Sequence, residues 1–186
     1  MPALAVADLR RNLLAELAAA RRIVPGLDQH EGAIRDCYAQ VTELTNPITI
    51  QRIHGDYHLA QVLGTSSGWI VLDFEGEPAS PLSQRRARSS PLRDVAGMLR
   101  SFDYAARHQV LTRPDPASLG PQASDWVRRN SDAFCAGYAA AGGLDPAENS
   151  VLLRAMLLDK AVYEAIYEAR NRPTWIPIPL ESIAEL

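Results

Sequence analysis

The chain has 186 residues, 47% of them hydrophobic, which is enough for one domain with its own core. Its formal net charge of −3 gives no electrostatic reason to bind nucleic acid or an anionic membrane. No apolar run is long enough to cross a bilayer and no signal-peptide pattern opens the sequence, so we expect a cytoplasmic protein without nucleic-acid or membrane partners.

Two amphipathic segments come first. Leucines recur at helical spacing over residues 8–22, and a second apolar stripe runs through residues 31–44. Pro25 separates the two predicted helices, and Pro47 ends the second before an extended run over residues 49–53. We expect both helices to pack on the rest of the same domain.

A polar motif follows the extended run. His54 precedes Asp56, the amide Gln61 comes five residues after Asp56, and a second carboxylate, Asp73, comes seventeen residues after it. Phosphoryl transfer uses such a set: a carboxylate that accepts the proton of an attacking hydroxyl, and an amide and a carboxylate that hold magnesium against nucleotide phosphates. Protein kinases have the same order, H-R-D-x-x-x-x-N followed by D-F-G. We therefore predict an ATP-dependent phosphotransferase with Asp56 as its catalytic residue.

The residues between Gln61 and Asp73 predict a β-hairpin. Two short apolar runs, residues 62–63 and 69–72, flank a turn rich in glycine and serine. Such a hairpin would return Asp73 to Gln61, so that their oxygens, with Glu75 as a further ligand, hold Mg²⁺. Taken alone, the segment from His54 to Asp56 is better explained as a turn, and the acidic segment that begins at Asp73 as a solvated loop. The joint spacing favours the kinase interpretation.

Residues 76–91 form a polar segment in the place where kinases have their activation segment. Its three arginines either meet phosphates or are solvated, and the sequence favours neither. Pro91 then opens a helix that carries Asp94 in its first turn. Asp94 either offsets the helix dipole or supports the backbone of the catalytic loop. The kinase architecture favours the supporting role, which we also assign to His54.

The remaining residues predict helices joined by loops. Residues 111–122 contain several prolines and predict a loop, and residues 123–141 predict a helix stopped by glycine. Asp145 begins a capping-box pattern, which predicts the start of a long helix that continues to Arg170.

The last turns of this long helix combine aromatic and charged side chains, namely Tyr163, Tyr167, Glu168 and Arg170. A sugar site needs both kinds, since sugar faces stack on rings and hydroxyls bond to charged groups. The alternative is the end of an ordinary amphipathic helix. The residues alone favour neither explanation.

Three stretches resemble the C-terminal lobe of maltokinases, within the aminoglycoside-phosphotransferase-like kinases: HGDYHLAQVL, GWIVLDFEGEP and SPLRDVAGMLRSFDYAA. The resemblance covers most of the chain, including YEARNRPTWIPIPL near its end, and Ala60 departs from it where glycine is expected. It implies a mainly helical α+β fold. Residues 1–186 would form a single protein-kinase-like C-terminal lobe, with a small β-hairpin that carries the catalytic and metal residues.

The resemblance also implies a reaction, the ATP-dependent conversion of maltose to maltose 1-phosphate within glycogen and trehalose metabolism. Trehalose synthase would then be a partner. The resemblance favours substrate contact for the four residues at the end of the long helix and for His58.

The parts that cover the nucleotide in a kinase are absent from this sequence. There is no glycine-rich phosphate loop, and the only lysine, Lys160, lies far along the chain. Because a working kinase needs such a loop and a strand lysine, we expect an N-terminal lobe to supply them and the isolated chain to be inactive. Two alternatives stay open. One is a phosphotransferase for another hydroxyl substrate, such as an aminoglycoside. Residues 94–141 contain few acidic side chains, which argues against a polycationic substrate of that kind. The other is a non-catalytic interaction module.

Overall fold

The computed structural model describes residues 3–78, 80–112 and 116–186. Most of these residues are helical and two small antiparallel sheets accompany them, so the predicted mainly helical α+β class is confirmed. In chain order the elements are β1 (Ala3–Leu4), α1 (Val6–Arg21), η1 (Pro25–His30), α2 (Glu31–Gln40), η2 (Val41–Glu43), β2 (Ile48–Thr49), η3 (Leu59–Gln61), β3 (Val62–Thr65), β4 (Gly68–Val71), α3 (Leu82–Arg85), α4 (Leu92–Leu111), α5 (Pro116–Ala140), α6 (Ser150–Asn171), η4 (Pro173–Trp175) and α7 (Pro177–Glu185), where η marks a 3-10 helix.

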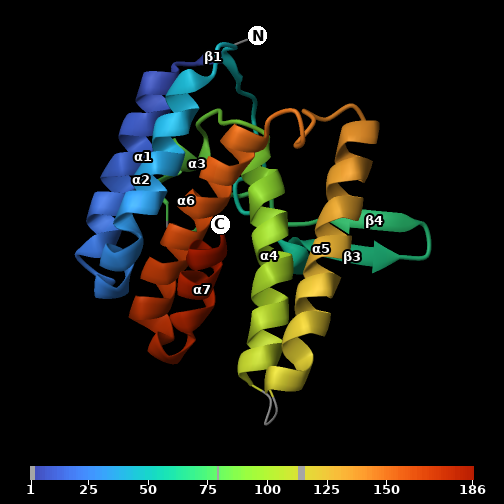
Figure 1. Cartoon of the computed structure of the whole chain (residues 1–186). Helices are drawn as coiled ribbons and strands as arrows, with labels where there is room; N and C mark the ends of the chain where they lie inside the picture. The colour runs from blue at the N-terminus through green and yellow to red at the C-terminus, as the bar shows by residue number, and fades with distance from the viewer. Residues whose placement is uncertain (1–2, 79, 113–115) are drawn as a thin grey trace.

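Helix α6 is the central element of the fold. It contacts α1 and α2 on one side, α4 on another, and α7 near its end. Figure 1 shows α1 and α2 side by side, with α4 and α5 forming a second pair. Loops between these two pairs carry the predicted catalytic motif, so the motif sits against helices that are distant in sequence.

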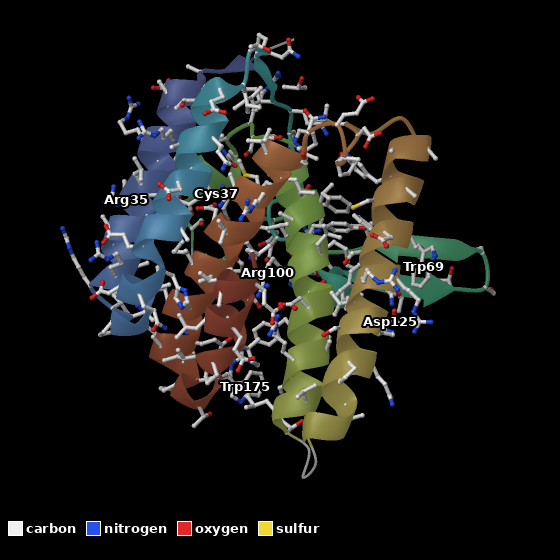
Figure 2. All side chains as sticks on the ribbon, viewed as in Figure 1. Arg35, Cys37, Trp69, Arg100, Asp125 and Trp175 are labelled. Carbon is white, nitrogen blue, oxygen red and sulfur yellow. The ribbon has the colours of Figure 1, made fainter. Side chains whose placement is uncertain are left out.

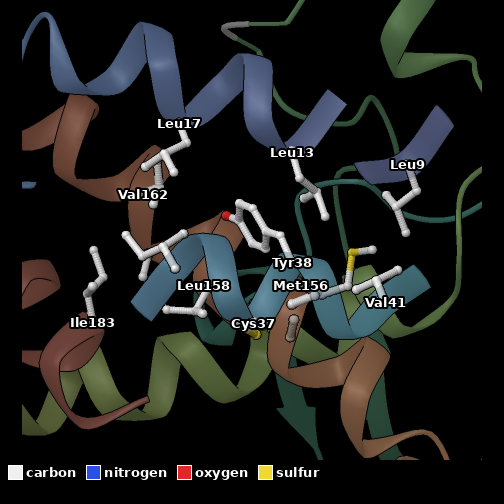
Figure 3. Close-up of a cluster of buried hydrophobic side chains, with 14 of the residues drawn as sticks. Leu9, Leu13, Leu17, Cys37, Tyr38, Val41, Met156, Leu158, Val162 and Ile183 are labelled. Carbon is white, nitrogen blue, oxygen red and sulfur yellow. The ribbon is translucent and has the colours of Figure 1, made fainter. Parts of the chain in front are cut away.

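The core lies where α1, α2 and α6 meet. Leu13 and Leu17 follow one another at a spacing of four on α1 and are both buried, as are Tyr38 of α2 and Val162 of α6. Figure 3 shows Tyr38 among side chains of α1 and α6. A fully buried aliphatic side chain of this kind contributes about 1.5–3 kcal/mol, which explains why the amphipathic stripe of α1 fixes its position.

The predicted hairpin is present between Gln61 and Asp73. Strand β3 pairs with β4 in antiparallel register, with Val62 opposite Val71. The hairpin extends from the helical body at the right of Figure 1. Trp69, labelled on it in Figure 2, is 78% exposed.

The predicted loop over residues 111–122 was wrong in its second half. Helix α5 begins at Pro116 and includes Pro121, while residues 113–115 lie outside the described part of the chain. Proline is tolerated at a helix start because its missing N–H has no partner there. The interior Pro121 removes one helix bond. Packing on α4, including edge-to-face contacts of Phe102 with Trp126 and Phe134, offsets that loss.

The capping box at Asp145 does not start the long helix, which was a second wrong boundary. Asp145 instead forms a turn: its Oδ1 accepts the N–H of Ala147 at 2.8 Å and its carbonyl accepts the N–H of Asn149 at 3.2 Å. Helix α6 begins only at Ser150. Aspartate favours turns and helix caps for the same reason, a short side chain that bonds nearby backbone N–H groups, so the pattern does not separate the two.

Two further boundaries differ from the predictions. The helix over residues 31–44 ends at Gln40 and continues as one turn of 3-10 helix to Glu43. Helix α7 was not predicted at all, since its two prolines, Pro177 and Pro179, obscure the helical pattern, although both lie in its first turn. Within the described residues, no helix is both long and apolar enough to cross a membrane.

Candidate active site

The loop that carries Asp56 is held on α4 by Asp94. Asp94 Oδ2 accepts the N–H of His54 at 2.7 Å, and its Oδ1 accepts the N–H of Gly55 at 2.9 Å. Burial raises the pKa of Asp94, and the two backbone donors oppose that shift because they favour the carboxylate. The loop is therefore tied to the first turn of a long helix, the geometry that a supporting role for Asp94 requires.

His54 joins this loop to the end of the hairpin. Its ring is buried, with 8% exposed, and Nε2 donates to the carbonyl of Leu72 at 2.7 Å. Its Nδ1 faces the N–H of Asp56 at 3.4 Å, a long acceptor contact. A neutral ring with its proton on Nε2 satisfies both contacts, so His54 fixes the backbone of Asp56 relative to Asp73, the residue after Leu72.

A close contact with α4 also positions the loop. A Cβ atom on Gly97 would lie 2.5 Å from the carbonyl oxygen of Tyr57, closer than real Cβ atoms approach. Gly97 lies one turn after Asp94 on the same helix. The absence of a side chain lets α4 touch the catalytic loop directly, a feature that the sequence analysis did not identify.

The carboxylate of Asp56 lies between two basic side chains. His58 Nε2 is 3.6 Å from its Oδ2, and Lys160 Nζ is 3.8 Å from its Oδ1. The contact with His58 is the largest cause that lowers the pKa of Asp56; burial opposes it and Lys160 adds to it. An ionised carboxylate that is only 15% exposed is suited to accept a proton from a hydroxyl.

Asp56 borders a cavity of about 250 Å³ whose walls come from the catalytic loop, the segment after the hairpin, and helices α1, α4 and α6. Lys160 is one of the lining residues: its Nζ is 3.5 Å from Glu77 Oε2 and 4.8 Å from the ring centre of Tyr163. Burial and a hydrogen bond to Glu77 raise the pKa of Tyr163, so its hydroxyl stays protonated. The sequence analysis missed Lys160 because it looked for a lysine on a strand.

Two of the predicted magnesium ligands, Gln61 and Asp73, have neighbouring backbones at the base of the hairpin. The N–H of Leu72 donates to the carbonyl of Gln61 at 2.9 Å. Asp73 directly follows Leu72 and is therefore close to Gln61 in the backbone. Asp73 has a φ of 54°, a left-handed conformation that is uncommon for residues other than glycine and that often marks a functional site.

These residues fit a magnesium ion that is partly held by substrate. Among the described residues, no three His, Cys, Asp or Glu side chains gather as a protein-only metal site. Mg²⁺ usually keeps several waters and takes one or two carboxylates together with phosphate oxygens. Gln61 and Asp73, with the exposed Glu75 two residues on, would supply such an incomplete set of hard oxygen ligands.

The predicted substrate residues separate into two groups. Tyr163 lines the cavity and His58 lies beside Asp56. Tyr167 is 43% exposed, and Arg170 is exposed, on the outer part of α6. Neither Glu168 nor Arg170 lines the cavity.

Glu168 is buried and already has hydrogen-bond partners. It is 1% exposed, its Oε1 accepts the hydroxyl of Tyr104 at 2.6 Å, and both its oxygens accept from Arg172 at 2.7 and 2.9 Å. Arg172 in turn stacks over the ring of Trp175 at 4.2 Å. The geometry therefore gives Glu168 a role in fixing the end of α6, where it holds Arg172 against Trp175 of η4.

Comparison with known proteins gives sugar kinases as relatives. No family model matches the chain. It is 31% identical over 156 residues to a glucosamine kinase of Streptacidiphilus jiangxiensis, and 33% identical over 134 residues to a glucosamine kinase of Mycolicibacterium smegmatis. The two alignments cover 82% and 68% of this chain, but 35% and 32% of the relatives. The chain thus spans about a third of the length of these curated relatives.

Solved structures give the same relationship. A glucosamine kinase in complex with glucosamine, ADP and inorganic phosphate matches 97% of this chain and 47% of its own chain, with 30% identity and a TM-score of 0.82. A second glucosamine kinase structure, crystal form A, matches 97% of this chain with the same TM-score. These findings show similarity to sugar kinases. The relatives are glucosamine kinases rather than maltokinases. The similarity therefore supports the class of sugar kinases, but not the resemblance to maltokinases in particular.

Proposed function

We propose that this chain is the catalytic lobe of an ATP-dependent sugar kinase. The observation that supports this most is the convergence of Asp56, Lys160 and Tyr163 on one cavity, beside the hairpin that carries Gln61 and Asp73. The similarity to glucosamine kinase, at 30% identity and a TM-score of 0.82, supports the same function. On this basis the fold is the C-terminal lobe of a protein-kinase-like enzyme.

In the proposed reaction Asp56 orients the acceptor hydroxyl and takes its proton. The oxygen attacks the γ-phosphorus of ATP, a new P–O bond forms, the bond to the β-phosphate oxygen breaks, and ADP leaves. Lys160 and His58 keep Asp56 ionised before the reaction. Magnesium, when bound by Gln61, Asp73 and Glu75, supplies positive charge to the phosphates.

The acceptor that we propose first is glucosamine, the sugar bound in the similar solved structure. A cavity of about 250 Å³ lies below the usual 300–1,000 Å³ of drug-sized pockets, which suits a monosaccharide. Maltose is the second candidate, because Tyr167, which is 43% exposed on the outer part of α6, provides an aromatic ring for a second sugar ring. A functional link to trehalose synthase follows only from the maltose alternative.

We also propose that a second lobe provides the glycine-rich loop and the lysine that this sequence lacks. The hairpin presents large apolar side chains to solvent beside the proposed metal ligands, and this surface fits contact with such a lobe. These exposed side chains are Leu63, Trp69, Ile70, Leu72 and Phe74.

The test uses a joined protein, made by fusing this chain to the part of the Streptacidiphilus jiangxiensis glucosamine kinase outside the matched region. We expect the joined protein to transfer phosphate from ATP to glucosamine, with maltose as the comparison sugar and phosphorus NMR to identify the product. The chain alone should show negligible transfer, because nothing covers the γ-phosphate. A joined protein that folds and binds ATP but transfers phosphate to neither sugar would contradict the proposal.

A further inference from the structure

One face of α4 follows the backbone of the catalytic loop along its whole length. Asp94 holds the start of the loop by two hydrogen bonds, and Gly97 lets the helix touch the carbonyl of Tyr57 in its middle. Ser101 comes next at the spacing i, i+3, i+7, which places the three residues on one side of the helix. Its Oγ accepts the N–H of Leu59 at 3.1 Å, so α4 also holds the end of the loop.

The hydroxyl of Ser101 is oriented for this contact by its own helix. Its O–H donates to the carbonyl of Met98 at 2.7 Å, which is much closer than Met98 Sδ at 3.6 Å. A hydroxyl has one proton and two lone pairs, so the Oγ that gives its proton to Met98 remains an acceptor. Serine commonly bonds a carbonyl of the preceding helical turn in this way. The remaining lone pair is available to Leu59.

Leu59 is the first residue of η3, and each of the three N–H groups of η3 has a partner. The first N–H groups of a helix have no acceptor inside the helix and need one from elsewhere. His58 supplies two acceptors: its Nδ1 accepts the N–H of Ala60 at 3.2 Å and its carbonyl accepts the N–H of Gln61 at 2.9 Å. Ser101 supplies the acceptor for Leu59. Of these partners only Ser101 comes from another element, so its bond attaches η3 to α4.

The two ends of η3 carry groups of the proposed site. His58, the residue before it, faces Asp56 at 3.6 Å, and its last residue is Gln61. The Gln61 carbonyl also accepts the N–H of Leu72, which connects η3 to the hairpin. A shift of η3 on α4 would therefore move Gln61 relative to Asp56.

We propose that Ser101 is a positioning residue that holds η3 on α4 and thereby sets the place of Gln61 relative to Asp56. The role given to Gln61 rests on the proposed function. Mg²⁺ demands near-ideal octahedral geometry and takes few protein ligands, so a displaced Gln61 weakens magnesium binding. Ser101 acts only through η3, and Asp56 keeps its own support from Asp94 and His54.

The first test measures amide hydrogen exchange by NMR on this chain and needs no activity. Ser101→Ala removes the acceptor of Leu59, so exchange of the Leu59 amide should speed up at least about five-fold. The amides of His54 and Gly55 have a different acceptor and should change less than about two-fold. Ser101→Thr keeps the hydroxyl and should keep the protection of Leu59.

Ser124→Ala is the matched control for this test, because Ser124 is exposed on α5. It should leave exchange of the Leu59 amide unchanged. Unchanged exchange at Leu59 in Ser101→Ala would overturn the proposal. Equal acceleration at Leu59, His54 and Gly55 would also overturn it, since that result indicates a general loss of stability.

The second test is a magnesium titration of initial rates in the joined protein. Ser101→Ala should raise the magnesium concentration for half-maximal rate by about two- to ten-fold, the effect of one hydrogen bond, and saturating magnesium should restore most of kcat. Gln61→Ala should raise it too. In the double variant, loss of Ser101 should add nothing to the loss of Gln61, because Ser101 acts through Gln61. Additive effects of the two substitutions would overturn the positioning role.

The two tests separate this proposal from the proposed function. Faster exchange at Leu59 in Ser101→Ala, without phosphate transfer by the unmodified joined protein, would support the attachment of η3 by Ser101 and contradict the kinase function. Phosphate transfer with an unchanged magnesium requirement in Ser101→Ala would overturn the positioning role and support the kinase function.

Discussion

At the scale of single residues, hydrogen bonds determine which nitrogen of each site histidine carries a proton. Nδ1 of His58 accepts the N–H of Ala60 at 3.2 Å, so its proton is on Nε2, which faces Asp56. His54 has the same tautomer, since its Nε2 donates to Leu72. In both tautomers the ring presents its Nε2–H, that of His58 to the Asp56 carboxylate and that of His54 to the Leu72 carbonyl.

This arrangement predicts how activity depends on pH. The contact with His58 lowers the pKa of Asp56, so the carboxylate is ionised across a wider acidic range. As pH falls through that pKa, Asp56 is protonated and the rate falls. In His58→Ala the pKa should rise, and the acidic limb of kcat/KM in the joined protein should move to higher pH. His30→Ala, at a surface turn, is the control. An acidic limb that stays in place would show that His58 does not act on Asp56.

A second pH effect concerns stability rather than rate. The pKa of Glu16 is about 8 in the folded chain, above its ordinary 4.5, so the folded state holds a proton that the unfolded state releases. Stability should therefore fall as pH rises from about 4.5 through 8. In Glu16→Gln this loss should disappear, so the Tm difference between variant and unmodified chain should grow from pH 5 to pH 8. Circular dichroism melts measure it, and a difference independent of pH would contradict the expectation.

At the scale of elements, α4 connects the catalytic loop to the rest of the lobe. Asp94 and Gly97 in its first turns hold the loop, and Arg100 in its next turn is 2% exposed and bonds Glu164 of α6 and Asp103 of α4. Figure 2 shows Arg100 between the helices. One helix therefore sets the distance between Asp56 on the loop and Lys160 on α6.

The close contact at Gly97 gives an element-scale prediction. Gly97→Ala places a methyl group 2.5 Å from the Tyr57 carbonyl, so α4 or the loop must move. We expect a loss of about 1–3 kcal/mol in unfolding free energy and a lower kcat in the joined protein. Gly137→Ala on α5 is the matched control, because no atom lies within 4 Å of its added Cβ, and it should leave both values almost unchanged or raise stability. Equal effects of the two substitutions would contradict the positioning role.

The sequence predicted those elements whose signals are local. The hairpin followed from apolar runs around a glycine-rich turn, and α1 and α4 followed from their stripes. Helices α5 and α7 were misjudged because prolines in or near their first turns resemble loop signals. Helix α6 began later than predicted because the aspartate of a capping box also forms turns.

The site was predictable only where its residues are close in sequence. Asp56, Gln61 and Asp73 were proposed as site residues from their spacing, and the structure places them around one loop and hairpin. The approach of Lys160 to Asp56, and of Gly97 to the loop, depends on how helices distant in sequence pack. Single-sequence patterns contain no information on such contacts, so these residues emerged only from the structure.

At the scale of the whole molecule, the exposed apolar side chains of the hairpin are the surface on which the proposal of a second lobe rests. Trp69 and Phe74 are 78% and 67% exposed, and the chain covers 47% of a similar solved structure. We expect the isolated chain to associate with itself through this surface at micromolar concentrations. Sedimentation should show that Trp69→Lys reduces this association, whereas Leu111→Lys, at the far end of α4, does not. A strictly monomeric chain would contradict the expectation.

The most direct test of the central claim is a magnesium titration of initial rates in the joined protein, at saturating ATP and sugar. Asp56→Asn removes the charge that takes the proton, so kcat should fall about 100-fold or more with an almost unchanged magnesium requirement. Asp73→Asn removes a charged metal ligand, so it should raise the magnesium concentration for half-maximal rate, and excess metal should restore part of the rate. If excess magnesium restored the rate of Asp56→Asn but not of Asp73→Asn, Asp56 would be the metal ligand and Asp73 the proton acceptor. Unchanged rates in both variants would contradict the kinase account of this site.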